Sequence, residues 1–308
     1  MFPLQKLLPR FVSGFQLGSG VKDIDFNVTR TIYCCQPLQA RFPAVVAGAK
    51  SSGALPPMNS QAPPFEHPFK IRLERGTVLP LVWLALGSAA LAEIAARSVP
   101  AAIVLDLQHG LWERGSLEAA AGIAGVCTSV IARTADFSAP AVGAALDAGV
   151  AAVMAPLVES ADDARVLAGA SRYPPQGRRS GGGVRPLLAG ADSMLAVNRH
   201  VAVGAMIETA LGAQNAEAIC AVAGIDFIFV GTGDLQLSMP DASPGQLKAC
   251  CARIRDIAHR QGLPCGLFTS DAVAARQAFA EGYELAVVAN DIGLAARGFA
   301  DAVQAARS

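Results

Sequence analysis

The chain has 308 residues, of which 52% are hydrophobic and 16% charged, and its 25 basic and 25 acidic residues balance. This length allows one large buried core, and the apolar composition is typical of α/β proteins whose strands are covered on both faces. The balanced charge, without a basic stripe, argues against nucleic acid as a partner. No uninterrupted apolar run is long enough to span a membrane, because Gly87 and Glu93 break the best candidate, residues 78–96.

The cysteines are scattered along the chain without C-x-x-C spacing. They are Cys34, Cys35, Cys127, Cys220, Cys250, Cys251 and Cys265. An odd, scattered set is not the pattern of a secreted disulfide framework. We therefore expect a cytoplasmic protein in which the thiols are small buried hydrophobic groups.

Residues 1–64 differ from the rest because they lack helix or strand periodicity and end in the loop-like SSGALPPMNSQAPP. We expect an extension with little fixed structure. Three interpretations stay open: Met58 is the true start and the preceding segment is not translated, the segment is a targeting leader, or it is a flexible arm. Lys6 and Arg10 favour a leader, whereas Pro3 and Pro9 interrupt the amphipathic helix that a leader needs.

In residues 65–308 short apolar segments alternate with helical ones, which predicts one catalytic domain built as a (β/α)8 TIM barrel. Strands are expected at 79–85, 101–106, 128–133, 151–156, 202–208, 226–231, 264–268 and 285–289. Helices are expected at 88–97, 114–124, 138–148, 160–171, 209–222, 244–261, 270–281 and 291–306. An open doubly wound sheet is the alternative, but no G-x-G-x-x-G follows the first strand.

One long insertion and four residues at the expected helix starts complete the predicted domain. Residues 174–199 form a long insertion rich in Gly, Pro and Arg, for which we expect a loop with a short extra helix. Loops of this length in compact domains are usually functional. Ser138, Ser160, Ser270 and Asp291 stand where helices are expected to begin, as N-cap residues do.

Polar residues follow several of the predicted strands at the point where each strand ends. Asp106 and His109 follow AAIVL, Arg133 follows TSVIA, Glu208 follows AVGAMI, and Asp234 follows DFIFVGTG. In a parallel barrel all such ends converge on one face, where barrel enzymes carry their catalytic residues. Two carboxylates, a His–Asp pair and an arginine in one mouth indicate a metal-assisted lyase.

Glu208 and Asp234 are the candidate metal ligands. Carboxylate oxygens suit a hard cation, and two such ligands completed by substrate and water oxygens suit Mg²⁺ or Mn²⁺, with Co²⁺ as a further candidate. No Cys/His cluster supports zinc. Each acid also has a plainer interpretation, since Glu208 can stabilise a helix N-terminus and Asp234 can be an N-cap.

His109 and Arg133 are candidates for proton transfer and for anion binding. An imidazole three residues after Asp106 can be held in one tautomer by the carboxylate and can take a proton near neutral pH. Arg133 ends a buried strand, where it can bind a carboxylate or stabilise a developing enolate oxygen. A backbone-bonded loop histidine and a structural salt bridge are the alternatives. No lysine ends a predicted strand, which argues against Schiff-base chemistry.

From residue 65 onward the chain resembles the metal-dependent pyruvate aldolases of the HpcH/HpaI type, among them 4-hydroxy-2-oxoheptanedioate aldolase and 2-dehydro-3-deoxyglucarate aldolase. The most specific motif is RYPPQGRRS (172–180), close to the family's R-Y-P-P-x-G-x-R-G. DLQH (106–109) is similar to its D-x-E-H, MIET (206–209) to its Q-I-E-T, and VGTGDL (230–235) to its I-G-P-A-D-L. IARTADFSAP (131–140) is similar to its third-strand arginine segment.

The resemblance implies roles for individual residues. Glu208 and Asp234 would bind the metal, His109 with Asp106 would act as the base, and Arg133 would hold the pyruvyl carbonyl or enolate oxygen. The resemblance further implies that amides around Gly233 and Asp234 bind the substrate carboxylate and that Trp83 closes one side of the pocket. It also implies a homohexamer in which the last helix is exchanged between neighbouring subunits.

Several positions depart from the family pattern. Gln108 replaces the family's Glu before the histidine, and Met206 replaces its Gln two residues before the metal Glu. Both family positions normally bond substrate or metal-bound water. Thr232 and Gly233 stand for the family's Pro-Ala, and Ser180 stands for a glycine. Such changes around a metal site commonly cost about tenfold to a hundredfold in affinity or activity, so substrate choice or efficiency can differ.

The sequence therefore predicts a class II aldolase that cleaves or forms 4-hydroxy-2-oxo acids, giving pyruvate and an aldehyde through a metal-stabilised pyruvate enolate. Two alternatives stay open. One is an acyl-CoA lyase of the citrate-lyase β type, against which the RYPPxG motif argues. The other is a non-catalytic 2-oxo-acid-binding homologue that has lost function through the changes at Gln108 and Met206.

Overall fold

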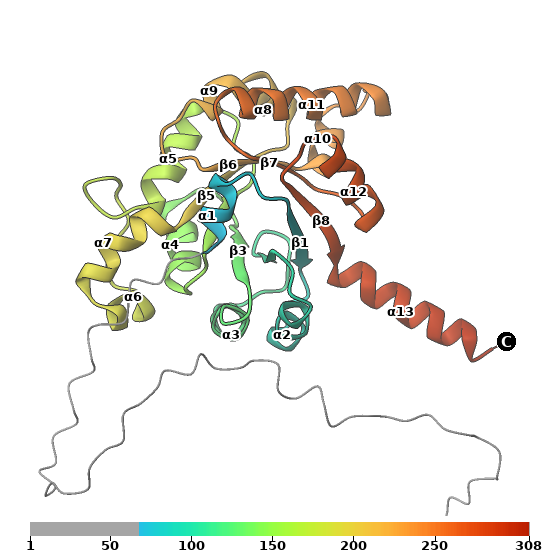
Figure 1. Cartoon of the computed structure of the whole chain (residues 1–308), viewed down its shortest axis with the longest axis horizontal. Helices are drawn as coiled ribbons and strands as arrows, with labels where there is room; N and C mark the ends of the chain where they lie inside the picture. Colours follow the sequence, from blue (N-terminus) through green and yellow to red (C-terminus); the bar gives the residue numbers. More distant parts are fainter. Residues whose placement is uncertain (1–67, 308) are drawn as a thin grey trace, which may run out of the picture. The chain divides into compact units, whose positions relative to one another are not determined.

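A computed structural model of the protein describes residues 68–307, which form a closed barrel of eight parallel strands surrounded by helices (Figure 1). Each strand pairs with the next along the chain, and β8 pairs with β1 to close the barrel. The predicted (β/α)8 barrel is confirmed. The expected extension over residues 1–64 lies outside the described residues. The strands are β1 (Leu79–Leu84), β2 (Ala102–Asp106), β3 (Ser129–Arg133), β4 (Ala152–Ala155), β5 (Ala202–Ile207), β6 (Phe227–Val230), β7 (Cys265–Leu267) and β8 (Leu285–Asn290).

Helices follow the strands and cover the outside of the barrel (Figure 1). They are α1 (Pro68–Glu74), α2 (Ala89–Arg97), α3 (Arg114–Ala124), α4 (Ala139–Asp147), α5 (Ala161–Ser171), α6 (Val184–Ala189), α7 (Ala191–His200), α8 (Ala210–Gln214), α9 (Ala216–Cys220), α10 (Thr232–Ser238), α11 (Pro244–Arg260), α12 (Ala272–Ala280) and α13 (Asp291–Ala305). No helix in residues 68–307 combines the length and the apolarity needed to cross a bilayer.

Two apolar cores result from the alternation of side chains along the strands. The inner core fills the barrel and is closed at its amino-terminal end by α1, whose Phe69 packs edge-on against Phe227 with ring centres 6.1 Å apart. The outer core lies between the strands and the alanine-rich faces of the helices. Because both faces of every strand are covered, the strands consist of almost continuous apolar residues, as the composition indicates.

The structure differs from the sequence prediction in the insertion at 174–199 and after β5. The insertion contains two helices, α6 and α7, rather than one, and Gly190 between them has φ 88°, a left-handed conformation that favours glycine. The single helix expected over 209–222 is divided at Asn215, whose side-chain amide donates to the Glu159 carbonyl at 2.7 Å. That bond draws Asn215 toward the loop before α5 and interrupts the helix.

Two of the four expected N-caps are confirmed, Ser138 and Ser160, since each side chain accepts a backbone N–H from the first helical turn. The other two predictions were one residue off. Asp271 rather than Ser270 caps α12, and Asn290 rather than Asp291 caps α13. Asp291 has a different partner, described below.

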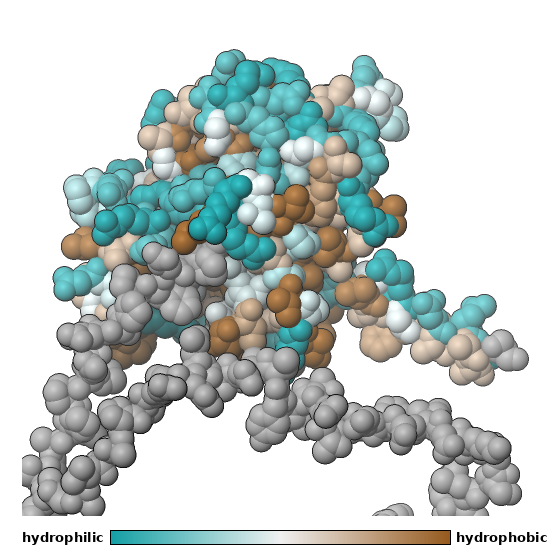
Figure 2. Space-filling model, in the orientation of Figure 1, coloured by the Kyte–Doolittle hydropathy of each residue, from teal (hydrophilic) through white to brown (hydrophobic). Residues whose placement is uncertain are grey.

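Helix α13 extends away from the barrel beyond the end of β8 (Figures 1 and 2). Asp291 is its only buried residue, whereas the apolar side chains of Ile292, Leu294, Phe299 and Val303 are all at least half exposed. A helix that buries so little apolar surface gains little stability from packing against its own barrel.

Candidate active site

One cavity of about 660 Å³ lies at the carboxyl-terminal end of the barrel. The structure brings nearly all the predicted site residues to its wall: Trp83, Asp106, His109, Arg133, Met206, Glu208, Gly233 and Asp234. Gln108 is the exception, because its side chain does not line this cavity and its Oε1 is buried without a hydrogen-bond partner among the described residues. The convergence follows from the parallel topology, which places the ends of β1, β2, β3, β5 and β6 on one face.

Asp106 and Arg133, the last residues of β2 and β3, form a two-pronged ion pair. The distance from Arg133 Nε to Asp106 Oδ1 is 2.9 Å, and Nη2 is 2.5 Å from Oδ2. Trp83 Nε1 also donates to Oδ2 at 3.2 Å, and the guanidinium carbon lies 5.0 Å from the centre of the Trp83 ring. Burial alone raises the pKa of Asp106, but the hydrogen bonds and charge of Arg133 outweigh it and hold the pKa below its ordinary value. The pair is therefore charged and rigid.

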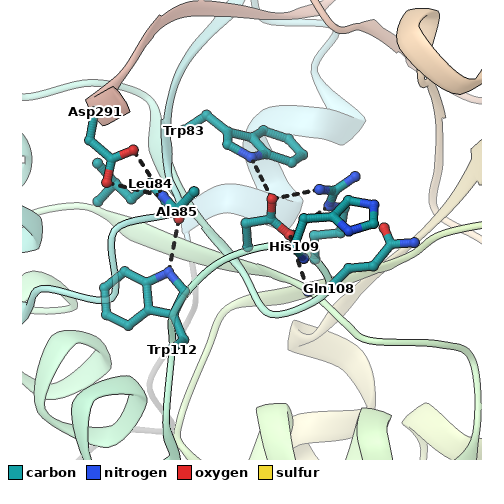
Figure 3. Close-up of polar contacts among 9 residues, drawn as sticks. Trp83, Leu84, Ala85, Gln108, His109, Trp112 and Asp291 are labelled. Atoms are coloured by element: carbon teal, nitrogen blue, oxygen red, sulfur yellow. Dashed lines mark hydrogen bonds and ion pairs between the residues drawn. The ribbon is translucent and has the colours of Figure 1, made fainter. Parts of the chain in front are cut away.

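The histidine is placed differently from the expected dyad. Asp106 Oδ1 accepts the backbone N–H groups of Gln108 and His109, both at 3.1 Å, rather than an imidazole N–H (Figure 3). The His109 side chain is exposed and makes no hydrogen bond or ion pair within residues 68–307. Asp106 thus orients the loop that carries His109, while both ring nitrogens are available to the cavity.

Glu208 and Asp234 face each other across the ends of β5 and β6. Glu208 is 1% exposed, and its Oε1 accepts the Leu157 backbone N–H at 2.9 Å. Burial, and next to it the negative charge of Asp234, raise the pKa of Glu208 to about 7, although the Leu157 bond lowers it. Neither carboxylate is ion-paired to a basic side chain of the described chain. Two adjacent carboxylates without a cation are electrostatically unfavourable, and a bound divalent cation removes that cost.

The backbone around these acids also suits a cation. A Cβ atom on Gly231 would lie 2.4 Å from Glu208 Oε2 and 2.8 Å from its Cβ, so the chain between β6 and α10 requires glycine where it passes the carboxylate. Within residues 68–307 no third His, Cys, Asp or Glu joins a possible metal cluster. The donor set therefore fits a hard cation that takes its remaining ligands from substrate and water, as Mg²⁺ does.

Other walls of the cavity are donors or apolar groups. The first helical hydrogen bond of α10 joins Leu235 N to Gly231 O at 3.1 Å, so the N–H groups of Thr232, Gly233 and Asp234 precede it and are free of intrahelical partners. Met206 is 1% exposed and belongs to the inner core. Its thioether gives the cavity an apolar floor where an amide would be polar.

Sequence reasoning missed the residues that hold the end of β1. The Asp291 carboxylate accepts the Ala85 N–H at 3.0 Å, and Trp112 Nε1 donates to the Leu84 carbonyl at 2.9 Å (Figure 3). The same carboxylate also accepts the Leu86 N–H at 2.9 Å. These contacts fix the backbone next to Trp83. The pattern that selected Asp106 and Glu208, a polar residue at the end of an apolar strand, also selects Asp291 when it is applied to β8.

The chain matches the family described as HpcH/HpaI aldolase/citrate lyase over residues 80–297. It is 32% identical over 257 residues to a hydroxypyruvate/pyruvate aldolase of Paraburkholderia phytofirmans, which covers 79% of this chain and 99% of that protein. It is 36% identical to a 4-hydroxy-2-oxovalerate aldolase of Novosphingobium aromaticivorans over 54% of this chain and 65% of that protein. The structure of an HpcH/HpaI aldolase/citrate lyase family protein from Burkholderia cenocepacia superposes with a TM-score of 0.74 at 30% identity, covering 79% of this chain and 100% of that chain. The resemblance inferred from the motifs is thereby confirmed, and the chain belongs to the HpcH/HpaI aldolase/citrate lyase family.

Proposed function

We propose that this protein is a divalent-metal-dependent aldolase that cleaves, and in reverse forms, 4-hydroxy-2-oxo acids. Pyruvate or hydroxypyruvate is the 2-oxo product, and an aldehyde is the other. One observation carries the proposal: two carboxylates without a cationic partner, Glu208 and Asp234, share a cavity with Arg133 and His109. The relatives named hydroxypyruvate/pyruvate aldolase support this substrate class.

Different residues of this chain bind the carbonyl oxygen, the carboxylate and the metal. Arg133 uses Nε and Nη2 for Asp106, so its remaining N–H groups donate to the carbonyl oxygen of the 2-oxo acid, where negative charge develops. The N–H groups of Gly233 and Asp234 bind the substrate carboxylate. A divalent cation held by Glu208 and Asp234 supplies Lewis-acid polarisation when bound.

His109 moves the proton. In cleavage a ring nitrogen takes the proton of the C4 hydroxyl, the C3–C4 bond breaks, and its electron pair stays on the 2-oxo fragment. The aldehyde leaves, and the proton returns to C3 to give pyruvate. Apolar side chains at the mouth, Leu237, Phe268 and Ile292, would surround the aldehyde, which supports a small or apolar aldehyde as the substrate.

The test is turnover by protein stripped of metal and resupplied with Mg²⁺, Mn²⁺ or Co²⁺. Pyruvate and hydroxypyruvate are offered with a panel of aldehydes, and oxaloacetate decarboxylation is followed in parallel because it needs only the metal site and Arg133. Metal-dependent aldol formation supports the proposal. Cleavage of malyl- or citramalyl-CoA without aldol activity would point instead to an acyl-CoA lyase, and failure of both reactions to a non-catalytic binder.

We also propose a homohexamer in the cytoplasm. The exposed apolar side chains of α13, among them Phe299 at 73% exposure, support burial of this helix against a second copy of the chain. Burial raises the pKa of the Cys251 thiol to about 11 and that of the Cys220 thiol to about 12. Thiols with such pKa values are unreactive at neutral pH, which supports a reducing compartment such as the cytoplasm. Light scattering gives the molar mass of the assembly. We expect a hexamer for the unaltered protein and for the apolar control Phe299→Leu, and smaller species for Phe299→Glu, which places a charge in the interface.

A further inference from the structure

A second cavity, of about 590 Å³, lies at the opposite end of the barrel from the active site. Its wall is formed by residues that precede or begin β2 to β5, namely 99–101, 126–130, 149–151 and 201. The R-Y-P-P loop and helices α6 and α7 of the insertion complete it. The cavity is within the size range of small-molecule sites, and none of its lining residues belongs to the proposed active site.

The charged side chains of this cavity are all cationic: Arg72, Arg179 and Arg185 line it, and no Asp or Glu does. Arg179 pairs with Asp147 at 2.9 Å. Arg72 and Arg185 are half-buried, and each donates to one backbone carbonyl, at 3.1 and 2.7 Å, without an ion pair in the described part of the chain. Half-buried arginines without an acidic partner leave guanidinium N–H groups that an anion can satisfy.

Three buried polar atoms of the same wall have no hydrogen-bond partner among residues 68–307. They are Ser129 Oγ, Tyr173 Oη and Arg179 Nε, three of the four such atoms found. Their residues are 7%, 4% and 4% exposed. Each can donate a hydrogen, and leaving a buried donor unpaired is costly. A ligand with acceptor oxygens would satisfy donors that the protein leaves unpaired.

The arginine from the insertion is accommodated by glycines on two other elements. A Cβ atom on Gly122 in α3 would lie 2.8 Å from Arg185 Nη2, and one on Gly149 would lie 3.2 Å from its Cδ. Gly149 also has a positive φ of 89°. The Arg185 side chain of α6 therefore reaches the barrel and packs closely against Gly122 and Gly149.

Most of the remaining wall is apolar, with Val99, Val126, Leu146, Val150, Met194 and Val197, although Thr128 and Ser193 also line it. We propose that this cavity is a second binding site, for a carboxylic acid that carries an aliphatic or aromatic body. The carboxylate meets the arginines and the unpaired hydroxyls, and the apolar body lies against the valines. A carboxylate fits better than a phosphate ester because a single charge loses less hydration on entering an apolar cavity and one of the three arginines is already paired with Asp147.

Calorimetric titration of the full-length protein with octanoate tests the site independently of catalysis. Saturable binding of one octanoate per chain is expected, and it should persist in the presence of saturating Mg²⁺ and oxalate, which occupy the carboxyl-terminal cavity. Octanol and octylamine should not compete, because they lack the anionic head. Displacement of octanoate by oxalate, or its loss in Arg133→Met, would place it in the active site and overturn the proposal. Tighter binding of octyl phosphate would overturn the choice of a carboxylate.

Variants separate binding from folding. Tyr173→Phe and Ser129→Ala each remove a hydroxyl without a partner, so the ligand-free protein should unfold at an unchanged or higher temperature. Octanoate affinity should fall roughly tenfold in each, and also in Arg185→Met, since a hydrogen bond to a charged group is worth about that factor. Arg276→Met, at an exposed arginine of α12, is the matched control and should bind normally. Wild-type affinity in Tyr173→Phe, Ser129→Ala and Arg185→Met would show that the cavity is only a packing feature.

Discussion

Both oxygens of the Asp106 carboxylate are paired with the guanidinium group of Arg133, with Nε 2.9 Å from Oδ1 and Nη2 2.5 Å from Oδ2. This pairing changes the meaning of the DLQH motif. The Asp106 carboxylate pairs with Arg133 and accepts the backbone N–H groups of Gln108 and His109, so it orients the arginine and the loop and makes no hydrogen bond to the His109 imidazole.

Replacement of Asp106 by Asn should destabilise the fold by about 3–5 kcal/mol at neutral pH, because Arg133 is left as a buried charge without its partner. The pKa of Asp106 lies below its ordinary value of 3.8, so the charged form is favoured in the folded protein. Its contribution is complete above the unfolded pKa and disappears as the pH falls through the folded pKa. Urea unfolding of both proteins from pH 7 to pH 3 measures this, with Asp192→Asn on the exposed face of α7 as the control. An equal difference at both pH values would contradict the ion-pair argument.

Glu208→Ala and Asp234→Ala should each abolish metal binding and metal-dependent turnover, because among residues 68–307 no third His, Cys, Asp or Glu groups with them to replace the lost ligand. The fold should survive, since removal of either acid relieves the repulsion between them, which adds to burial in raising the pKa of Glu208. Calorimetric titration with Mn²⁺ measures metal binding, and circular dichroism measures whether the fold is kept. Glu217→Ala on α9 provides an acid outside the cavity as control. Full metal-dependent turnover by either variant would remove that residue from the metal site.

His109→Ala should lower kcat by roughly 10²–10⁴ while Mn²⁺ affinity stays near that of the unaltered protein, as expected for a lost proton-transfer group. The imidazole makes no hydrogen bond to Glu208 or Asp234, the proposed metal ligands, so metal affinity is expected to stay the same. His200→Ala, at the end of α7, is the matched control. A variant with the original rate across the pH range would exclude the histidine from the mechanism.

The double replacement Gln108→Glu with Met206→Gln should move selectivity from apolar toward polar aldehydes. The two single variants should contribute unequally to this change in selectivity. Met206 lines the cavity and Gln108 does not, so Met206→Gln should account for most of the change. The measurement is kcat/KM for succinic semialdehyde against propionaldehyde in all four proteins. An unchanged ratio in the double variant would show that these positions do not set the aldehyde preference.

Asp291→Ala should raise KM for the 2-oxo acid and destabilise the protein by about 1–3 kcal/mol, because the buried Ala85 N–H and the partly buried Leu86 N–H lose their acceptor. The loosened end of β1 would release Trp83, which packs against Arg133. Trp fluorescence reports the local change, and Asp291→Asn, which keeps one acceptor oxygen, should recover part of the stability. Unaltered fluorescence and KM in Asp291→Ala would show that Asp291 does not position Trp83 and is only an acid in the first turn of α13.

Much of the architecture was predictable from local patterns. The eight strands follow from short β-branched segments between alanine-rich helical ones, and Asp106, Arg133, Glu208 and Asp234 converge because parallel topology brings strand ends together. The division of the helix after β5 was not predictable, since it depends on the bond from Asn215 to the Glu159 carbonyl, 56 positions away in the sequence.

The fold class, the family and the positions of the charged groups could be predicted from the chain alone, because these depend on periodicity and on short motifs. The hydrogen-bond and ion-pair partners of those groups depend on how the barrel folds. Asp106 binds Arg133 instead of the His109 imidazole because β2 and β3 are adjacent and in register at Asp106 and Arg133. Asp291 binds the end of β1 because the barrel closes between β8 and β1. Such contacts join residues distant in the chain, and no local pattern encodes the distance between them.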